Sequence, residues 1–133
     1  MFPLYDTARS RTFPLINLTL ILANVLAFLY ELQMGSGGLE RFIFTWGLIP
    51  ARFAGDPANT WNTIYTSMFL HGGWFHIFSN MMALWVFGRR VEDVCGPWRF
   101  LAFYLACGFM ADIVAVVTRM HSNQPGIGAS GAL

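Results

Sequence analysis

The chain has 133 residues, of which 56% are hydrophobic and only 11% are charged, whereas a typical globular protein carries about 25% charged residues. A net charge of +1 at pH 7 excludes the strongly basic surface that binds nucleic acid. A water-soluble domain could not cover so much apolar surface, so the composition predicts a protein embedded in a lipid bilayer.

The first predicted element is an uncharged stretch over residues 12–30, close to the roughly 20 residues that a membrane-spanning helix needs. A signal peptide is the competing interpretation, because Arg9 and Arg11 precede this stretch. The stretch is longer than the apolar region of about 7–15 residues in signal peptides, however, and no small-residue cleavage site follows it. We therefore expect a retained helix in which Asn17 and Asn24 share one face, turned toward the protein interior.

A long connection follows over residues 33–72. Its length is unusual for a plain linker. Aromatic residues such as Trp46 and Trp61 favour a position at the boundary between membrane and water, where their rings are stable. We therefore predict that this segment is a long interfacial loop.

Two further apolar stretches, at about residues 74–94 and 98–118, predict a second and a third spanning helix. Turn-forming residues over 119–127 then lead into Gly-Ala-Ser-Gly-Ala-Leu at 128–133, which is typical of a new helix beginning. The predicted fold is all-α, a polytopic membrane helical bundle with three complete transmembrane helices and the start of a fourth. All of it would belong to one membrane domain over residues 1–133.

The arginines divide between the two membrane sides that three spans would create. One side would hold Arg9, Arg11, Arg89, Arg90 and Arg99, and the other would hold Arg41, Arg52 and Arg119. Cytoplasmic segments carry the excess of basic residues in membrane proteins. The N-terminal segment 1–13 is therefore predicted to be cytoplasmic.

His76 and Asn80 lie four residues apart in the second predicted span, so both side chains project from one face of a helix. Polar groups at membrane depth need hydrogen-bond partners or a water-filled cavity. Two donors aimed into a cavity could stabilise a developing oxyanion. The alternative is that both side chains hydrogen-bond to neighbouring helices. His71, just before the helix, would either line the cavity or tie the loop to the helix end.

A second candidate motif is Gly128-Ala129-Ser130-Gly131. Flanking glycines let another backbone approach closely and leave a serine hydroxyl uncovered. A serine at the start of a helix also lies near free backbone N–H groups, which favour the negative charge that nucleophilic attack creates. Taken alone, the motif is equally compatible with a contact between helices through small residues.

Together, the pattern His71-x4-His76-x3-Asn80 followed by GxSG resembles the rhomboid family of intramembrane serine proteases, in particular its prokaryotic members. The resemblance extends to GLIPARF at 47–53 and to TSMFLHGGWFHIFSNMMALWVFG at 66–88. It implies that Ser130, between the motif glycines Gly128 and Gly131, is the catalytic nucleophile. It also implies that His76, Asn80 and the backbone N–H of Ser130 line the oxyanion hole, and that the role of His71 is structural.

The resemblance further implies cleavage of transmembrane protein substrates near the membrane surface, without metal or cofactor. The expected location is the bacterial plasma membrane, as a multi-pass integral protein. One departure concerns the general base, which in the family is a histidine on the sixth core helix, whereas this sequence ends three residues after Ser130. We expect a truncated piece of an enzyme, inactive alone; the alternative is an inactive rhomboid-like protein that binds or scaffolds transmembrane partners.

Other chemistry receives less support from the sequence. Neither His76 nor His121, which lies in a polar loop, is expected to act as the general base in place of the family's histidine. A metal site formed by His71 with these two histidines is disfavoured, because no carboxylate or cysteine lies at ligand spacing. Asp112 interrupts the third predicted span and is a candidate functional residue for that reason, but the sequence assigns it no role.

Overall fold

The computed structural model describes residues 12–133, and for Ser130 the backbone only. Residues 1–11 of the predicted cytoplasmic segment, with Arg9 and Arg11, lie outside the described residues. The helices are α1 (Leu15–Leu32), α2 (Ser36–Trp46), α3 (Pro50–Gly55), α4 (Pro57–Thr60), α5 (Thr63–Thr66), η1 (Ser67–Phe69), α6 (Trp74–Ala83), η2 (Leu84–Gly88), α7 (Arg89–Cys95), α8 (Pro97–Thr118) and η3 (Ala129–Gly131). Between residues 12 and 133 the fold contains no β-strand beyond one isolated bridge, Leu48 with Gly126.

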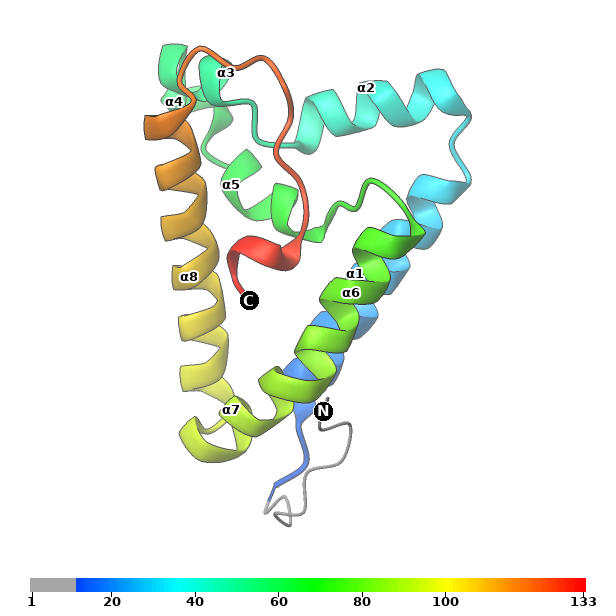
Figure 1. Cartoon of the computed structure of the whole chain (residues 1–133), viewed down its shortest axis with the longest axis vertical. Coiled ribbons are helices and arrows are strands. Elements are labelled where there is room, and N and C mark those ends of the chain that lie inside the picture. The colour runs from blue at the N-terminus through cyan, green and yellow to red at the C-terminus, as the bar shows by residue number, and fades with distance from the viewer. Residues whose placement is uncertain (1–11) are drawn as a thin grey trace.

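Three long helical segments stand side by side and form the body of the molecule (Figure 1). Two of them, α1 and α8, are long and apolar enough to cross a membrane. The third runs without a break from α6 through the π-helical segment η2 into α7. Its last turns carry the charges of Arg89, Arg90, Glu92 and Asp93. The all-helical class is confirmed, and the crossing of the membrane by this third segment stays a prediction.

The start of α1 is capped by a distant carboxylate. The residue before the helix, Pro14, makes no side-chain hydrogen bond to the helix end. Instead, the Glu92 carboxylate accepts the backbone N–H groups of Ile16 at 2.9 Å and Asn17 at 2.7 Å, and its side chain is only 1% exposed. A negative charge at a helix N-terminus satisfies free N–H groups and opposes the helix dipole. Glu92 therefore fastens α7 to the start of α1.

The predicted interior face of α1 is confirmed, because Asn17 and Asn24 are both fully buried. Asn24 donates its side-chain N–H to the Leu20 carbonyl at 2.7 Å. A Cβ added to Gly88 would collide with the Asn17 side-chain oxygen. The π-helical segment therefore approaches α1 at a point where only a glycine fits.

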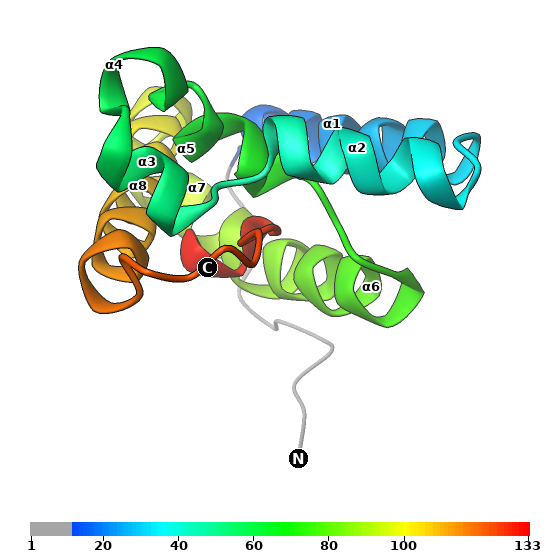
Figure 2. The same ribbon diagram turned by 90° about the horizontal axis from the view of Figure 1, so that it is seen from above.

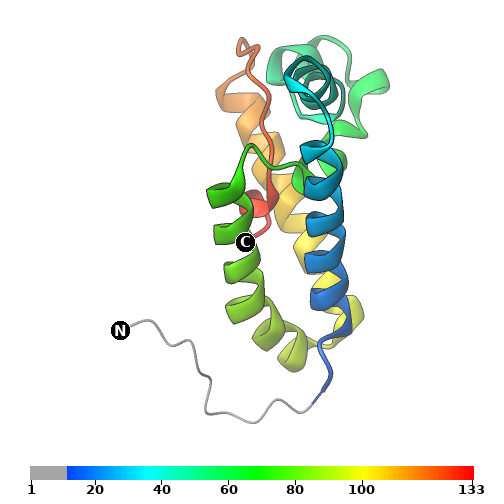
Figure 3. The same cartoon turned by 90° about the vertical axis from the view of Figure 1, so that its right-hand side faces the viewer.

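The predicted interfacial loop, residues 33–72, is largely helical: α2, α3 and α4 lie at one end of the long segments, and α5 and η1 reach back along α8 (Figures 1 and 3). Arg52 holds part of it together. Its guanidinium donates to the carbonyl of Phe44 at 2.6 Å and to those of Thr45 and Gly47 at 3.3 Å. These carbonyls end α2, where a cation offsets the helix dipole. The location of this segment at the membrane interface remains a prediction.

After α8 the chain returns between α8 and α6 and ends in the short turn η3, at the place of the predicted fourth helix (Figure 2). Small residues on α8 make room for it. A Cβ added to Gly131 would lie 2.9 Å from the Cβ of Ala111, and one added to Gly108 would lie 3.4 Å from the Cβ of Ala132. Larger side chains at these positions would push η3 out of the bundle.

Candidate active site

The segment before η3 is held by backbone hydrogen bonds to two distant parts of the chain. Leu48 and Gly126 exchange both of their backbone hydrogen bonds, at 3.1 and 2.7 Å. The backbone N–H of Gly128 donates to the Ser67 carbonyl at 2.8 Å. The GxSG motif is thus fixed at its first residue by η1 and, two residues earlier, by the segment that follows α2.

Gly128 is required by both its conformation and its surroundings. Its φ is +108° and its ψ is 157°, a region of backbone space that is essentially restricted to glycine. A Cβ at this position would lie 2.5 Å from Nε2 of His76 and 3.3 Å from Nδ2 of Asn80. The two side chains predicted for the oxyanion hole therefore converge on the backbone two residues before Ser130.

Both converging groups present a donor toward Gly128. Nδ1 of His76 accepts the backbone N–H of Gly72 at 3.4 Å. In a neutral imidazole the other ring nitrogen then carries the proton, so Nε2 is an N–H donor beside Gly128. Asn80 is 5% exposed, and its Nδ2 is buried without a hydrogen-bond partner among the described residues. Two donors are therefore available to an incoming negative charge.

His71 is separate from this pair of donors. Its side chain is 1% exposed, its backbone N–H donates to the Glu31 carboxylate at 3.2 Å, and Nδ1 lies 3.3 Å from the Phe69 carbonyl. Its ring centroid is 5.1 Å from that of His76. Burial, with a smaller contribution from the nearby His76, lowers the pKa of His71 to about 4. A neutral, buried His71 therefore belongs to the connection that leads into α6, the helix that carries His76.

The remaining predicted site residues are placed as follows. Ser130 lies in the short turn η3, directly before Gly131, which packs against α8. His121 is exposed in the connection that follows α8. Among residues 12–133, no group of three or more histidine, cysteine, aspartate or glutamate side chains is arranged to hold a metal ion.

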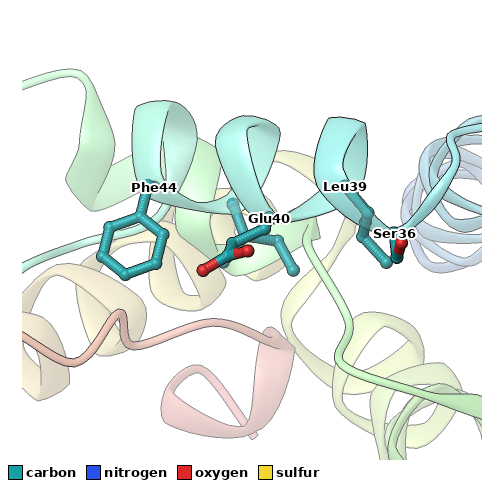
Figure 4. A pocket seen from close by; sticks show the side chains of 5 residues that line it. Ser36, Leu39, Glu40 and Phe44 are labelled. Atoms are coloured by element: carbon teal, nitrogen blue, oxygen red, sulfur yellow. The ribbon is translucent and has the colours of Figure 1, made fainter.

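Two hollows differ in their relation to this site. One, of about 180 Å³, lies beneath residues 126–131 and is lined by Ser67, Asp112 and Gly128 among others. The other, of about 310 Å³, lies beside α2, where Leu39, Glu40 and Phe44 project on the same side of the helix (Figure 4). The first hollow borders the candidate site through Gly128 and Gly131, whereas no predicted site residue lines the second.

Several residues that shape the site were not singled out by sequence reasoning. Ser67 anchors Gly128 through its backbone, an interaction for which a sequence carries no signal. Glu31 and Glu92 are buried carboxylates that bind backbone N–H groups. The sequence could have pointed to both, because an acidic residue near the end of an apolar helix needs a hydrogen-bond partner.

The chain is similar to known proteins over the part that holds the candidate site. The family model described as Rhomboid domain matches residues 58–133. Rhomboid protease GluP of Bacillus subtilis is 35% identical over 106 residues, which cover 80% of this chain and 20% of the relative. RHOMBOID-like protein 5 of Arabidopsis thaliana is 33% identical over 78 residues, covering 59% and 25%.

A third relative is the mitochondrial presenilin-associated rhomboid-like protein of Homo sapiens, 32% identical over 85 residues, which cover 61% of this chain and 22% of the relative. The matched part thus spans only 20% to 25% of the length of these three relatives. No solved structure matches the chain.

Proposed function

The chain belongs to the rhomboid family of intramembrane proteases, and from this membership we propose that it carries the nucleophile and oxyanion hole of a serine endopeptidase that cleaves transmembrane proteins near the membrane surface. Family membership and two apolar helices indicate an integral membrane protein. The bacterial plasma membrane, with the N-terminus in the cytoplasm, is the proposed location and orientation.

One observation carries the proposal: Nε2 of His76 and Nδ2 of Asn80 both lie beside the backbone at Gly128, and Nδ2 of Asn80 has no hydrogen-bond partner among the described residues. A buried donor without a partner is costly in a membrane protein. A catalytic oxyanion is a partner that exists only during the reaction, and donors placed in advance stabilise it without further reorganisation.

In the proposed reaction the Ser130 hydroxyl attacks the scissile carbonyl carbon while its proton passes to a general base. The negative charge that develops on the carbonyl oxygen accepts hydrogen bonds from His76, Asn80 and the Ser130 backbone N–H. Collapse of this intermediate breaks the C–N bond, and the base returns the proton to the leaving amine. Water then attacks the acyl-enzyme by the same route and releases the second product.

We further propose that the general base is a histidine outside these 133 residues, as the family resemblance implies. His71 is buried beside the Phe69 carbonyl, and His121 is exposed after α8. His76 is assigned to the oxyanion, and a residue that donates to the oxyanion cannot at the same time accept the serine proton through the same nitrogen. The isolated chain is therefore expected to lack activity.

The test uses the natural full-length protein reconstituted in lipid vesicles with a transmembrane substrate. Ser130→Ala should abolish cleavage and labelling by a fluorophosphonate, which reacts with activated serines, while membrane insertion is unchanged. Ser36→Ala, in α2, is the matched control and should keep both activities. Cleavage by Ser130→Ala above background would overturn the nucleophile assignment, and a wild-type protein that neither cleaves nor reacts would favour a binding role.

A further inference from the structure

Asp112 lies in the last two turns of α8, an apolar helix that is long enough to cross a membrane, yet the proposed reaction does not use it. It is half-buried in α8. An ionisable side chain at such a position is costly unless it has a partner. Its partner is Ser67, whose Oγ lies 3.1 Å from Oδ2 of Asp112. Placing a carboxyl group in an apolar helix costs free energy, and this one contacts η1, so we expect that contact to have a function.

We propose that Asp112 is a positioning residue that holds the GxSG segment in place through Ser67. The inference rests on the proposed function and adds a residue to it. Three contacts connect the two sites. Asp112 binds the Ser67 side chain, the Ser67 carbonyl accepts the Gly128 N–H at 2.8 Å, and Gly128 lies against His76 and Asn80.

The first contact fixes the Ser67 side chain. Ser67 is 2% exposed, and its Oγ lies 3.0 Å from the Ile64 carbonyl as well as 3.1 Å from Asp112. A hydroxyl group holds a single proton but accepts through two lone pairs. Its single proton is therefore shared between two acceptors, and the loss of Asp112 leaves only the Ile64 carbonyl, so the hydroxyl is no longer drawn toward α8. Through this side chain Asp112 ties the first residue of η1 to α8, and the carbonyl of the same residue accepts the Gly128 N–H.

The second contact matters because packing alone does not hold the loop. The hollow of about 180 Å³ lies between α8 and residues 126–131, and Asp112, Ser67 and Gly128 all line it. Residues 126–128 border this hollow and have fewer packing neighbours on that side than η3 has, so hydrogen bonds contribute more to their position. By contrast, η1 itself is wedged firmly, since a Cβ at Gly108 would lie 2.6 Å from the Met68 sulfur. A shift of Ser67 within η1 would reach Gly128 through the hydrogen bond between the Ser67 carbonyl and the Gly128 N–H.

The experiment measures kcat and KM for a transmembrane substrate, the rate of fluorophosphonate labelling, and the thermal stability of the full-length protein. Asp112→Ala should lower kcat and labelling by about tenfold, the loss expected for one hydrogen bond to a charged group, with KM unchanged. Asp112→Asn should restore most of the activity, because its amide can donate to the Ser67 oxygen. Thr118→Ala, which removes a hydrogen bond to Val114 within the same helix, is the matched control.

A double-mutant cycle tests whether Asp112 acts through Ser67. Ser67→Ala should show the same loss of kcat as Asp112→Ala, and the double variant should lose no more than either, because the two side chains form one connection. If the two losses multiply, Asp112 acts by another route and the inference is wrong. Should Asp112→Ala fail to fold, Ser67→Ala and Asp112→Asn decide the question.

Amide hydrogen exchange gives an answer that does not depend on activity. Asp112→Ala should speed exchange in a peptide covering residues 126–131 by about tenfold, whereas Thr118→Ala should not. Normal activity and exchange in Asp112→Ala, with Ser130→Ala inactive, would refute the positioning role and leave the proposed function intact. Cleavage by Ser130→Ala would refute the proposed function instead, while altered exchange would still support the connection from Asp112 to the loop.

Discussion

The substitution Gly128→Ala tests the candidate site most directly. A new Cβ would lie 2.5 Å from Nε2 of His76, whereas ordinary contacts begin at 3.4 Å. Either the histidine ring or the loop must therefore move by about 0.9 Å, the difference between these two distances. The backbone conformation, with φ at +108°, adds about 1–3 kcal/mol of strain for a residue with a side chain.

A displacement of about 1 Å at a catalytic group lowers a rate by roughly a hundredfold. We therefore expect Gly128→Ala in the full-length protein to lower kcat for a transmembrane substrate by about two orders of magnitude, with a small effect on KM. Gly126→Ala, in the same loop, is the matched control, because its Cβ would lie 3.6 Å from the Leu48 carbonyl oxygen, an ordinary contact. A Gly128→Ala enzyme within threefold of the wild-type kcat would refute the reasoning.

Three further predictions follow from the described contacts. Glu92→Ala removes two charge-assisted hydrogen bonds at the start of α1, so the free energy of unfolding should fall by about 3 kcal/mol, measured in detergent by denaturation; an unchanged value would show that water replaces the carboxylate. Asn80→Ala should lower kcat by about 100-fold to 1,000-fold without a matching rise in KM, whereas Ser79→Ala should have little effect, and equal losses in both would contradict the oxyanion role. His71 has a lowered pKa of about 4, so the unfolded chain binds more protons than the folded one between about pH 6.5 and 4, and stability should fall as pH decreases through that window. Thermal unfolding of His71→Gln should show a smaller loss over this window, and an identical loss would assign the effect to another group.

Much of the helical fold could be predicted from hydrophobicity alone. Apolar stretches identified α1 and α8, and helical spacing placed Asn17 and Asn24 on one buried face. The spacing of His76 and Asn80 also predicted a shared direction, and both lie beside Gly128. These features were accessible because they depend on helix periodicity and on the cost of burying polar groups in an apolar environment.

What the sequence could not supply is mostly backbone hydrogen bonding between distant segments. The Leu48–Gly126 bridge and the Ser67–Gly128 bond involve main-chain atoms, which every residue possesses, so side-chain identity gives no hint of the pairing. The helical character of residues 33–72 was also not anticipated. Its helices are short, and the cap that Arg52 provides for α2 depends on tertiary contact rather than on local propensity.

The carboxylate cap on α1 has a consequence for the order of assembly. Its donors, Ile16 and Asn17, precede Glu92 by 76 and 75 residues, so all of α1 has been synthesised long before the acceptor. During that interval the exposed N–H groups at the start of α1 must be solvated by water or by lipid headgroups. The start of α1 therefore receives its carboxylate cap only after α7 has been synthesised and has packed against it.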